Sequence, residues 1–203
     1  MSREFYEWMF RNDPNRWDNG TDGHQGVDSF IVNFLKPYWG KSIKILDMGC
    51  GNGRTLNYIY RPEWQVTGID FISEAIKAAK IKLGEKATLI VADMTNTRLE
   101  SFAYDIVYSC GSHEHMDFPN FSEARRLMKH DGYFLCTVSI GDRGKVESAF
   151  CHKTGTPQWG RQWEWEFPAS QWKSLLQEAG FDVINVNEDR GEFTCQGQGR
   201  KIP

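Results

Sequence analysis

The chain has 203 residues, with 24 Lys and Arg against 27 Asp and Glu, so its formal net charge is −3. This length fits one globular domain, and a charge near zero offers no field to hold a polyanion, which disfavours a dedicated nucleic-acid binder. No apolar run approaches the roughly 20 residues of a membrane span, so we expect neither a signal peptide nor a membrane helix.

The cysteines are odd in number, widely spaced and without a CxxC pair, which argues against a disulfide framework and against a structural zinc site. We therefore expect a reducing, cytoplasmic location and no bound metal. The residues are Cys50, Cys110, Cys136, Cys151 and Cys195.

The middle of the chain alternates short apolar runs with helical patterns, which is typical of βαβ units and a parallel sheet. The runs show little polar alternation, as expected for strands that helices cover on both faces. We predict strands at Lys44–Asp47, Gln65–Asp70, Thr88–Asp93, Asp105–Ser109 and Tyr133–Ile140.

Three helices have recognisable ends. Ser73 is a candidate cap for a helix over Glu74–Leu83. A second helix is predicted over Asn120–Lys129, and a third over Ala169–Ala179 with Ser170 as its candidate cap.

The end of the chain predicts a hairpin. Two apolar runs, Phe181–Asn187 and Glu192–Gln196, flank the turn sequence Asp189-Arg190-Gly191. The predicted fold class is therefore α/β: a doubly wound three-layer sandwich whose seven-stranded sheet is mostly parallel, with one antiparallel edge strand.

Ligands of such sheets bind at the carboxyl ends of the strands. There the first strand leads into three glycines at alternate positions, Gly49, Gly51 and Gly53, which allow a tight turn and close approach to a ligand. A dinucleotide fingerprint would need glycine at Arg54, and Asp47 suits an ammonium group better than a pyrophosphate. The loop therefore favours a cationic or zwitterionic ligand.

Two further predicted strand ends carry acids. A carboxylate at Asp70 can accept hydrogen bonds from both hydroxyls of a ribose. Asp93 and Met94 can frame an adenine, by a hydrogen bond at its edge and thioether packing on its face. Acids at three successive strand ends together indicate a ligand site.

Over Ser42–Asn187 the chain resembles the class I S-adenosylmethionine-dependent methyltransferases. The matching segments are LDMGCGNG (46–53), GID (68–70), ADM (92–94), YDIVYS (104–109) and RRLMKHDGYF (125–134).

The resemblance implies S-adenosylmethionine as the cofactor and assigns it a set of contacts. The loop approaches the methionine portion, the acid at 70 holds the ribose, and Ser109 or Cys110 lies near the methionine portion. Phe71, Asp93 and Met94 surround the adenine. The predicted cofactor-binding residues are Asp47, Gly49, Cys50, Gly51, Asp70, Phe71, Asp93, Met94, Ser109 and Cys110.

The fourth strand end should lie closest to the reactive methyl. It lacks the Asn/Asp-Pro-Pro-aromatic motif of the DNA and peptide-release amide methyltransferases. His113 and His115 are candidate catalytic bases for a hydroxyl, thiol or amine acceptor. Two alternatives stay open: positioning without a base, or histidines that only orient the loop.

Aromatic residues are concentrated in two flanking segments. They could form a local core, or a lid over the carboxyl edge that builds an acceptor pocket with Arg16, His24 and Arg161 as polar contacts. The aromatic residues are Phe5, Tyr6, Trp8, Phe10, Trp17, Trp159, Trp163, Trp165, Phe167 and Trp172.

We predict a single domain over residues 1–203. It consists of an N-terminal cap and first helix (1–40), a cofactor-binding βα core (41–140), a lid-like insertion (141–168) and a C-terminal helix and hairpin (169–203).

The predicted function is methyl transfer from S-adenosylmethionine to an O, N or S atom of a small molecule, with no membrane partner. The alternatives are a non-catalytic cofactor-binding domain, an NAD-dependent dehydrogenase and a nucleic-acid methyltransferase. The last would need a continuous basic track made of Arg125, Arg126, Lys129 and Lys153.

Overall fold

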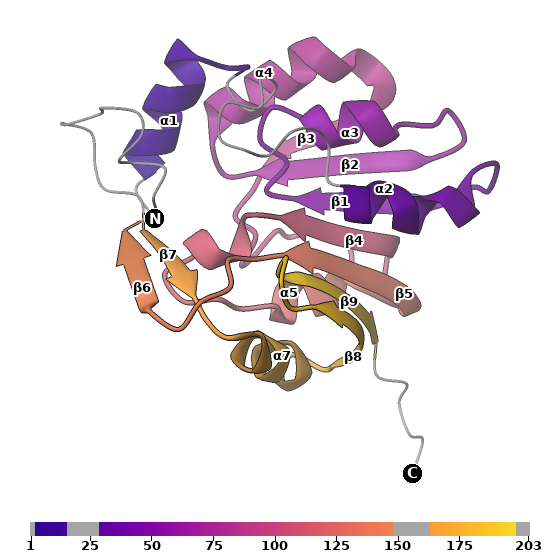
Figure 1. The fold of residues 1–203 in the computed structure, drawn as a ribbon. Helices are drawn as coiled ribbons and strands as arrows, with labels where there is room; N and C mark the ends of the chain where they lie inside the picture. The colour runs from indigo at the N-terminus through magenta and orange to yellow at the C-terminus, as the bar shows by residue number, and fades with distance from the viewer. Residues whose placement is uncertain (1–2, 16–28, 148–162, 198–203) are drawn as a thin grey trace.

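A computed structural model describes residues 3–15, 29–147 and 163–197 of the chain (Figure 1). Its main feature is a seven-stranded sheet in the order β3-β2-β1-β4-β5-β9-β8. The strands are β1 (Lys44–Met48), β2 (Gln65–Asp70), β3 (Thr88–Val91), β4 (Tyr104–Cys110), β5 (Met128–Thr137), β8 (Phe181–Asn187) and β9 (Glu192–Gly197).

The predicted fold class is confirmed. Neighbouring strands from β3 to β5 pair in parallel, whereas β9 pairs antiparallel with both β5 and β8. The reversed strand β9 therefore lies one position inside the sheet, with β8 as the outermost strand.

Helices cover both faces of the sheet, and a small two-stranded sheet of β6 (Gly144–Glu147) and β7 (Trp163–Glu166) lies outside it (Figure 1). The α-helices are α1 (Arg3–Asn12), α2 (Ser29–Leu35), α3 (Arg54–Ile59), α4 (Ser73–Leu83), α5 (Ser122–Leu127) and α7 (Ala169–Glu178). The 3₁₀ helices are η2 (Lys36–Tyr38), η3 (Gly84–Lys86) and η4 (His113–His115).

Alternate residues of the central strands belong to two separate hydrophobic cores. Ile45 of β1 packs in the core that includes Leu56 of α3 and Ile76 of α4. Its neighbour Leu46 packs in the core on the other face, which includes Trp172 of α7. Because successive side chains of a strand point to opposite faces, the continuous apolar runs of the sequence serve both cores.

The helix predicted over Asn120–Lys129 is shorter, and the prediction of its end was wrong. Met128 leaves the helix to pair with Tyr104, and strand β5 continues through Gly132. A Cβ at Gly132 would lie 2.8 Å from the Asp105 carbonyl oxygen, so glycine permits this close approach of the two strands. Strand β5 also ends at Thr137 rather than at Ile140.

Both predicted serine caps were wrong. Helix α4 begins at Ser73 itself, and the Ser73 hydroxyl donates to the Glu74 carboxylate instead of capping. Helix α7 begins at Ala169 with Pro168 in the capping position, so Ser170 already lies inside the helix. Strand β3 ends at Val91, two residues before the predicted end.

The connections place several loops at one edge of the sheet. Strand order reverses between β1 and β4, and such a switch point opens a crevice at the carboxyl ends of the strands. Figure 1 shows α1 and the β6–β7 hairpin beyond that edge. In the described part of the chain, no helix is long and apolar enough to cross a membrane.

Candidate active site

The loop after β1 is a strongly curved backbone segment. Gly49, Gly51 and Gly53 have φ angles of +82°, +53° and +74°, in the left-handed region that favours glycine. The Ile69 carbonyl of β2 accepts hydrogen bonds from the amides of Gly49 and Cys50, at 2.8 and 2.9 Å. These bonds tie the start of the loop to the neighbouring strand.

Side chains from two other loops meet the glycines directly. A Cβ at Gly49 would collide with the Ser112 hydroxyl and would lie 3.4 Å from the Met94 methyl group. A Cβ at Gly51 would lie 3.5 Å from Phe10 of α1. The loop therefore borders the ends of β3 and β4 as well as the N-terminal helix.

Asp70 fastens the loop to the end of β2. Its Oδ2 atom accepts the Gly51 amide and its Oδ1 atom accepts the Ile72 amide, each at 2.9 Å. Burial raises the pKa of Asp70 to about 6, although these backbone donors oppose the rise. Each carboxylate oxygen keeps a second acceptor site, so the residue still has the capacity to accept hydroxyl hydrogen bonds from a ribose.

Asp47, in strand β1 just before the loop, is buried and does not reach the surface of the protein. It is 3% exposed, and it stands opposite Tyr108 in the register between β1 and β4. Burial raises the pKa of Asp47 to about 8, so the group is mainly protonated at neutral pH. Among the described residues, the buried Tyr108 hydroxyl has no hydrogen-bond partner.

Of the remaining predicted adenine contacts, Met94 lies against the glycine-rich loop. Asp93 is exposed and Met94 is half-buried beside Gly49. Phe71 packs against the small core formed by α1 and the start of α4, which includes Phe5 and Ile72.

The predicted site residues at the end of β4 do not lie together, because their side chains belong to opposite faces of the sheet. Ser109 is 1% exposed and lies 2.8 Å from Nδ1 of His113, which stacks on Phe121 with ring centroids 4.5 Å apart. Burial lowers the pKa of His113 to about 3. Cys110 instead packs toward the opposite core. His113 is thus part of the molecule's interior.

His115 lies where three elements meet. Its Nδ1 atom is 3.2 Å from the Trp163 carbonyl of β7, and its ring is 6.3 Å from the ring of Tyr6 in α1. Because a carbonyl only accepts, Nδ1 carries the proton in this contact and Nε2 carries a lone pair. Burial lowers the pKa of His115 to about 4, so the imidazole is neutral at physiological pH.

Sequence reasoning missed two residues of this edge, Ser112 and Glu114. Glu114 is 4% exposed, burial raises its pKa to about 8, and its Oε2 atom has no partner among the described residues. A short polar segment gives no periodic signal to distinguish these inward side chains from solvated ones. Within the described ranges, no cluster of three or more acid, His or Cys side chains could hold a metal ion.

The lid predicted from aromatic residues is only partly described. Strand β7 packs on η4, where the Trp165 indole N–H is shared by the carbonyls of Met116 and Asp117, at 3.1 and 3.2 Å. The predicted residues Arg16, Trp17, His24, Lys153, Trp159 and Arg161 lie outside the described residues, as does Cys151. The other cysteines are free thiols.

The strand order and the glycine-rich loop at the switch point define a class I, Rossmann-like methyltransferase fold. Residues 46–136 match a family model described as a methyltransferase domain. The match spans a little less than half of the chain, and this part is therefore similar to methyltransferase domains.

Among known proteins, the chain is 27% identical over 143 residues to a ubiquinone biosynthesis O-methyltransferase of Maricaulis maris. The match covers 67% of this chain, and the chain spans about half of that relative, 54% of its length.

Two solved structures share the fold over nearly the whole chain. A 1,6-didemethyltoxoflavin-N1-methyltransferase of Burkholderia thailandensis, bound to 1,6-didemethyltoxoflavin and S-adenosylhomocysteine, has a TM-score of 0.65 at 17% identity, covering 98% of this chain and 91% of that one. The PH0226 protein of Pyrococcus horikoshii has a TM-score of 0.71 at 17% identity, covering 94% and 99%.

Proposed function

We propose that the protein transfers a methyl group from S-adenosylmethionine to an O, N or S atom of a small molecule. The observation that carries the proposal is the convergence of the glycine loop, Asp70 and His115 at one edge of the sheet. In this proposal the bound cofactor supplies an electrophilic methyl group on a sulfonium, which becomes a neutral thioether as the C–S bond breaks and the bond to the acceptor forms.

The residues present fit this cofactor. Glycine at position 49 lets Ser112 and Met94 pack directly against the loop, which brings the ends of β1, β3 and β4 together. Asp70 would accept the ribose hydroxyls, and Asp93 and Met94 would flank the adenine. The backbone of residues 49–51 would approach the methionine portion.

His115 is the better of the two candidate bases. Its Nε2 lone pair can take a proton from the acceptor as the new bond to the methyl carbon forms, while the Trp163 carbonyl holds Nδ1–H. His113 lacks that access because it is 1% exposed and stacked in the core. We therefore assign His113 a role in fixing the turn after β4.

Two observations favour a small acceptor over a nucleic acid. Tyr6 of α1 and the β7 backbone both contact His115, so two other elements border the proposed base and limit the room for a bulky acceptor. Arg126 and Lys129 are engaged by Glu123 and Asp105 in ion pairs of 2.7 and 2.6 Å. Two members of the proposed basic track are thus already neutralised by the protein.

The first test measures cofactor binding by calorimetry. We expect the wild type to bind S-adenosylhomocysteine, and we expect Asp70→Ala to lose at least about tenfold in affinity because the ribose contact and the loop anchor disappear together. Equal binding by Asp70→Ala and the wild type would contradict the cofactor site.

The second test measures turnover with a panel of small hydroxyl, thiol and amine acceptors. His115→Gln should lower methyl transfer by about 100-fold, within the usual range for loss of a general base, while S-adenosylhomocysteine binding stays unchanged. His130→Gln is the matched control, because His130 lies near the start of β5, at the opposite end of the strand from the carboxyl edge of the sheet. Cofactor binding by the wild type without turnover on any acceptor would favour a non-catalytic binding domain.

A further inference from the structure

The loop between β3 and β4 is irregular but closely bonded. Arg98 and Phe102 adopt φ angles of +60° and +56°, which residues other than glycine rarely do. Such a backbone persists only where surrounding contacts fix it. The contacts that fix this loop therefore also affect the position of Asp93 and Met94, which lie at its start.

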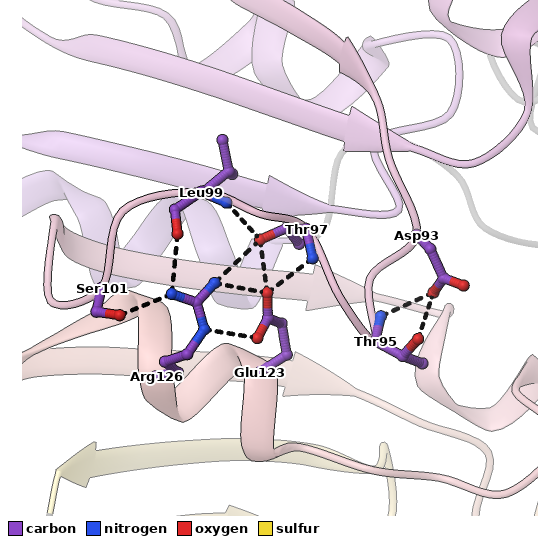
Figure 2. Close-up of polar contacts among 7 residues, drawn as sticks. All are labelled: Asp93, Thr95, Thr97, Leu99, Ser101, Glu123 and Arg126. Atoms are coloured by element: carbon purple, nitrogen blue, oxygen red, sulfur yellow. Dashed lines mark hydrogen bonds and ion pairs between the residues drawn. The ribbon is translucent and has the colours of Figure 1, made fainter.

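Glu123 of α5 holds the loop at Thr97. Its Oε1 atom accepts the Thr97 amide at 2.8 Å and the Thr97 hydroxyl at 2.6 Å (Figure 2). The Thr97 residue is 7% exposed, so these bonds are made largely out of water. One carboxylate thus binds both the main chain and the side chain of the same loop residue.

Arg126 completes the attachment. It forms a two-pronged pair with Glu123 through Nε and Nη2, at 2.7 Å each, while Nη1 donates to the Leu99 carbonyl at 2.8 Å and to the Ser101 hydroxyl at 2.7 Å (Figure 2). The guanidinium lowers the pKa of Glu123 to about 2, so the pair stays charged at neutral pH. Glu123 and Arg126 together therefore fix the loop at Thr97, Leu99 and Ser101.

A second set of bonds carries this fixed position back to the start of the loop. The Oδ1 atom of Asp93 accepts the Thr95 amide and the Thr95 hydroxyl, both at 2.8 Å (Figure 2). The Asn96 amide donates to the Asp93 carbonyl at 3.0 Å. Thr97, the residue that Glu123 holds, comes directly after this turn. Met94, within the turn, lies against Gly49 of the loop after β1.

We propose that Glu123 and Arg126 are a positioning pair for cofactor recognition: they set the loop so that Asp93 and Met94 meet the adenine ring. The proposal rests on the cofactor site of the proposed function. The pair touches no part of the cofactor, so it acts through the loop and governs discrimination between bases more than affinity for the methionine portion.

The Lys129–Asp105 ion pair provides a matched control. Its side chains are 37% and 30% exposed, and that of Arg126 is 35% exposed, so the two cations are similarly accessible. Asp105 also accepts the Lys44 amide, at the start of β1 and opposite the cofactor edge. Removing the Lys129 side chain should therefore affect stability without changing the position of the loop between β3 and β4.

The experiment compares two probes by calorimetry, S-adenosylhomocysteine and S-inosylhomocysteine, in which a carbonyl replaces the amino group of adenine. We expect the wild type to prefer the adenine probe, because the Oδ2 atom of Asp93, which has no partner among the described residues, suits an amino donor. Arg126→Met should weaken binding of the adenine probe about tenfold and change that of the inosine probe by less than about twofold. Lys129→Met should change neither.

Two milder variants keep the test valid if Arg126→Met unfolds. Arg126→Lys retains the charge but not the fork, and should restore only part of the preference. Thr97→Val removes the hydroxyl alone and should lower the preference by a smaller factor. Thermal unfolding of each variant separates loss of folding from loss of recognition.

The outcomes distinguish the two proposals. A wild type that binds neither probe refutes the cofactor site and the positioning role with it. A wild type that binds the adenine probe while Arg126→Met keeps the same preference refutes the positioning role alone. Equal weakening of both probes by Arg126→Met and by Lys129→Met would likewise refute it, because that pattern is general destabilisation.

Discussion

Gly49 is a residue at which the loop after β1 packs directly against the loop after β4. A side chain there would meet the Ser112 hydroxyl and would require a φ of +82°. We expect Gly49→Ala to lower the free energy of unfolding by about 2 kcal/mol, from backbone strain and overpacking together. S-adenosylhomocysteine affinity should fall at least about tenfold, as measured by calorimetry.

Gly40 separates these two causes. It has a φ of +76°, and a Cβ there would have no atom within 4 Å. Gly40→Ala should therefore show the backbone strain alone, about 1 kcal/mol in urea unfolding, with unchanged ligand affinity. Equal effects of the two substitutions on ligand binding would show that contact with Ser112 is irrelevant.

Asp47 predicts a pH dependence of stability. Burial raises the pKa of Asp47 from 3.8 to about 8, so the folded protein holds this proton more tightly than the unfolded chain. The stability that the protonated group contributes is complete below about pH 4 and is lost as the pH rises toward about 8.

Asp47→Asn cannot lose that proton. Urea unfolding at about pH 5 and about pH 9 should therefore show the variant gaining stability relative to the wild type at the higher pH. A difference in stability that is the same at both pH values would mean that Asp47 is ionised in the folded state.

His113 and His115 show what residue patterns cannot specify. Both were candidate bases because both follow the fourth strand, yet one stacks on Phe121 in the core and the other reaches β7. Their different directions depend on the turn of η4 and on where the hairpin docks. Both of these are tertiary features without a local sequence signal.

The β6–β7 hairpin is the element through which the insertion contacts the site. Trp165→Phe would keep an aromatic side chain but remove the indole donor shared by the Met116 and Asp117 carbonyls. We expect a loss of about 1 kcal/mol in the free energy of unfolding. Amide hydrogen exchange should become faster across η4 and β7, because the hairpin is held there by this donor.

Trp172→Phe is the control for this prediction. It removes an indole bond of similar length, 3.0 Å to the Ser139 carbonyl, from helix α7. The loss of stability should be larger, because Trp172 is fully buried and the smaller ring leaves a cavity, while exchange across η4 should be unchanged. Faster exchange at η4 in both variants would indicate a global effect instead of local docking.

The parallel strands could be predicted because each carries an apolar run that two cores require. Strand β2 was predicted to its exact bounds, Gln65–Asp70, and β8 likewise. The end of α5 could not be predicted, since Arg125–Lys129 is a good helical sequence. Pairing of Met128 with Tyr104 overrides that local preference.

The cofactor side of the site was accessible from sequence for a similar reason. A glycine loop and strand-end acids follow directly from the topology of a doubly wound sheet. The pair of Glu123 and Arg126 was not accessible, because its bonds join α5 to a loop more than twenty residues earlier. Helical spacing alone marks these residues as a solvated surface pair.

At the scale of the whole molecule, the folded sheet assembles the ligand site and so couples ligand binding to the stability of the domain. The glycine loop, Asp70, Asp93 and the turn after β4 belong to four separate strand ends, which only the folded sheet brings together. A ligand that bridges them binds the folded state and not the unfolded chain. Ligand binding should therefore appear directly as stability of the whole domain.

This coupling distinguishes a methyltransferase from a dehydrogenase of related fold. At about 100 times its Kd, S-adenosylhomocysteine should add about 2.7 kcal/mol to the free energy of unfolding. For a chain of 203 residues this corresponds to a rise in Tm of about 5–10 °C in thermal scans. NADH should give no shift, because Arg54 replaces the glycine that a dinucleotide loop needs at that position. A shift with NADH and none with S-adenosylhomocysteine would reverse the assignment.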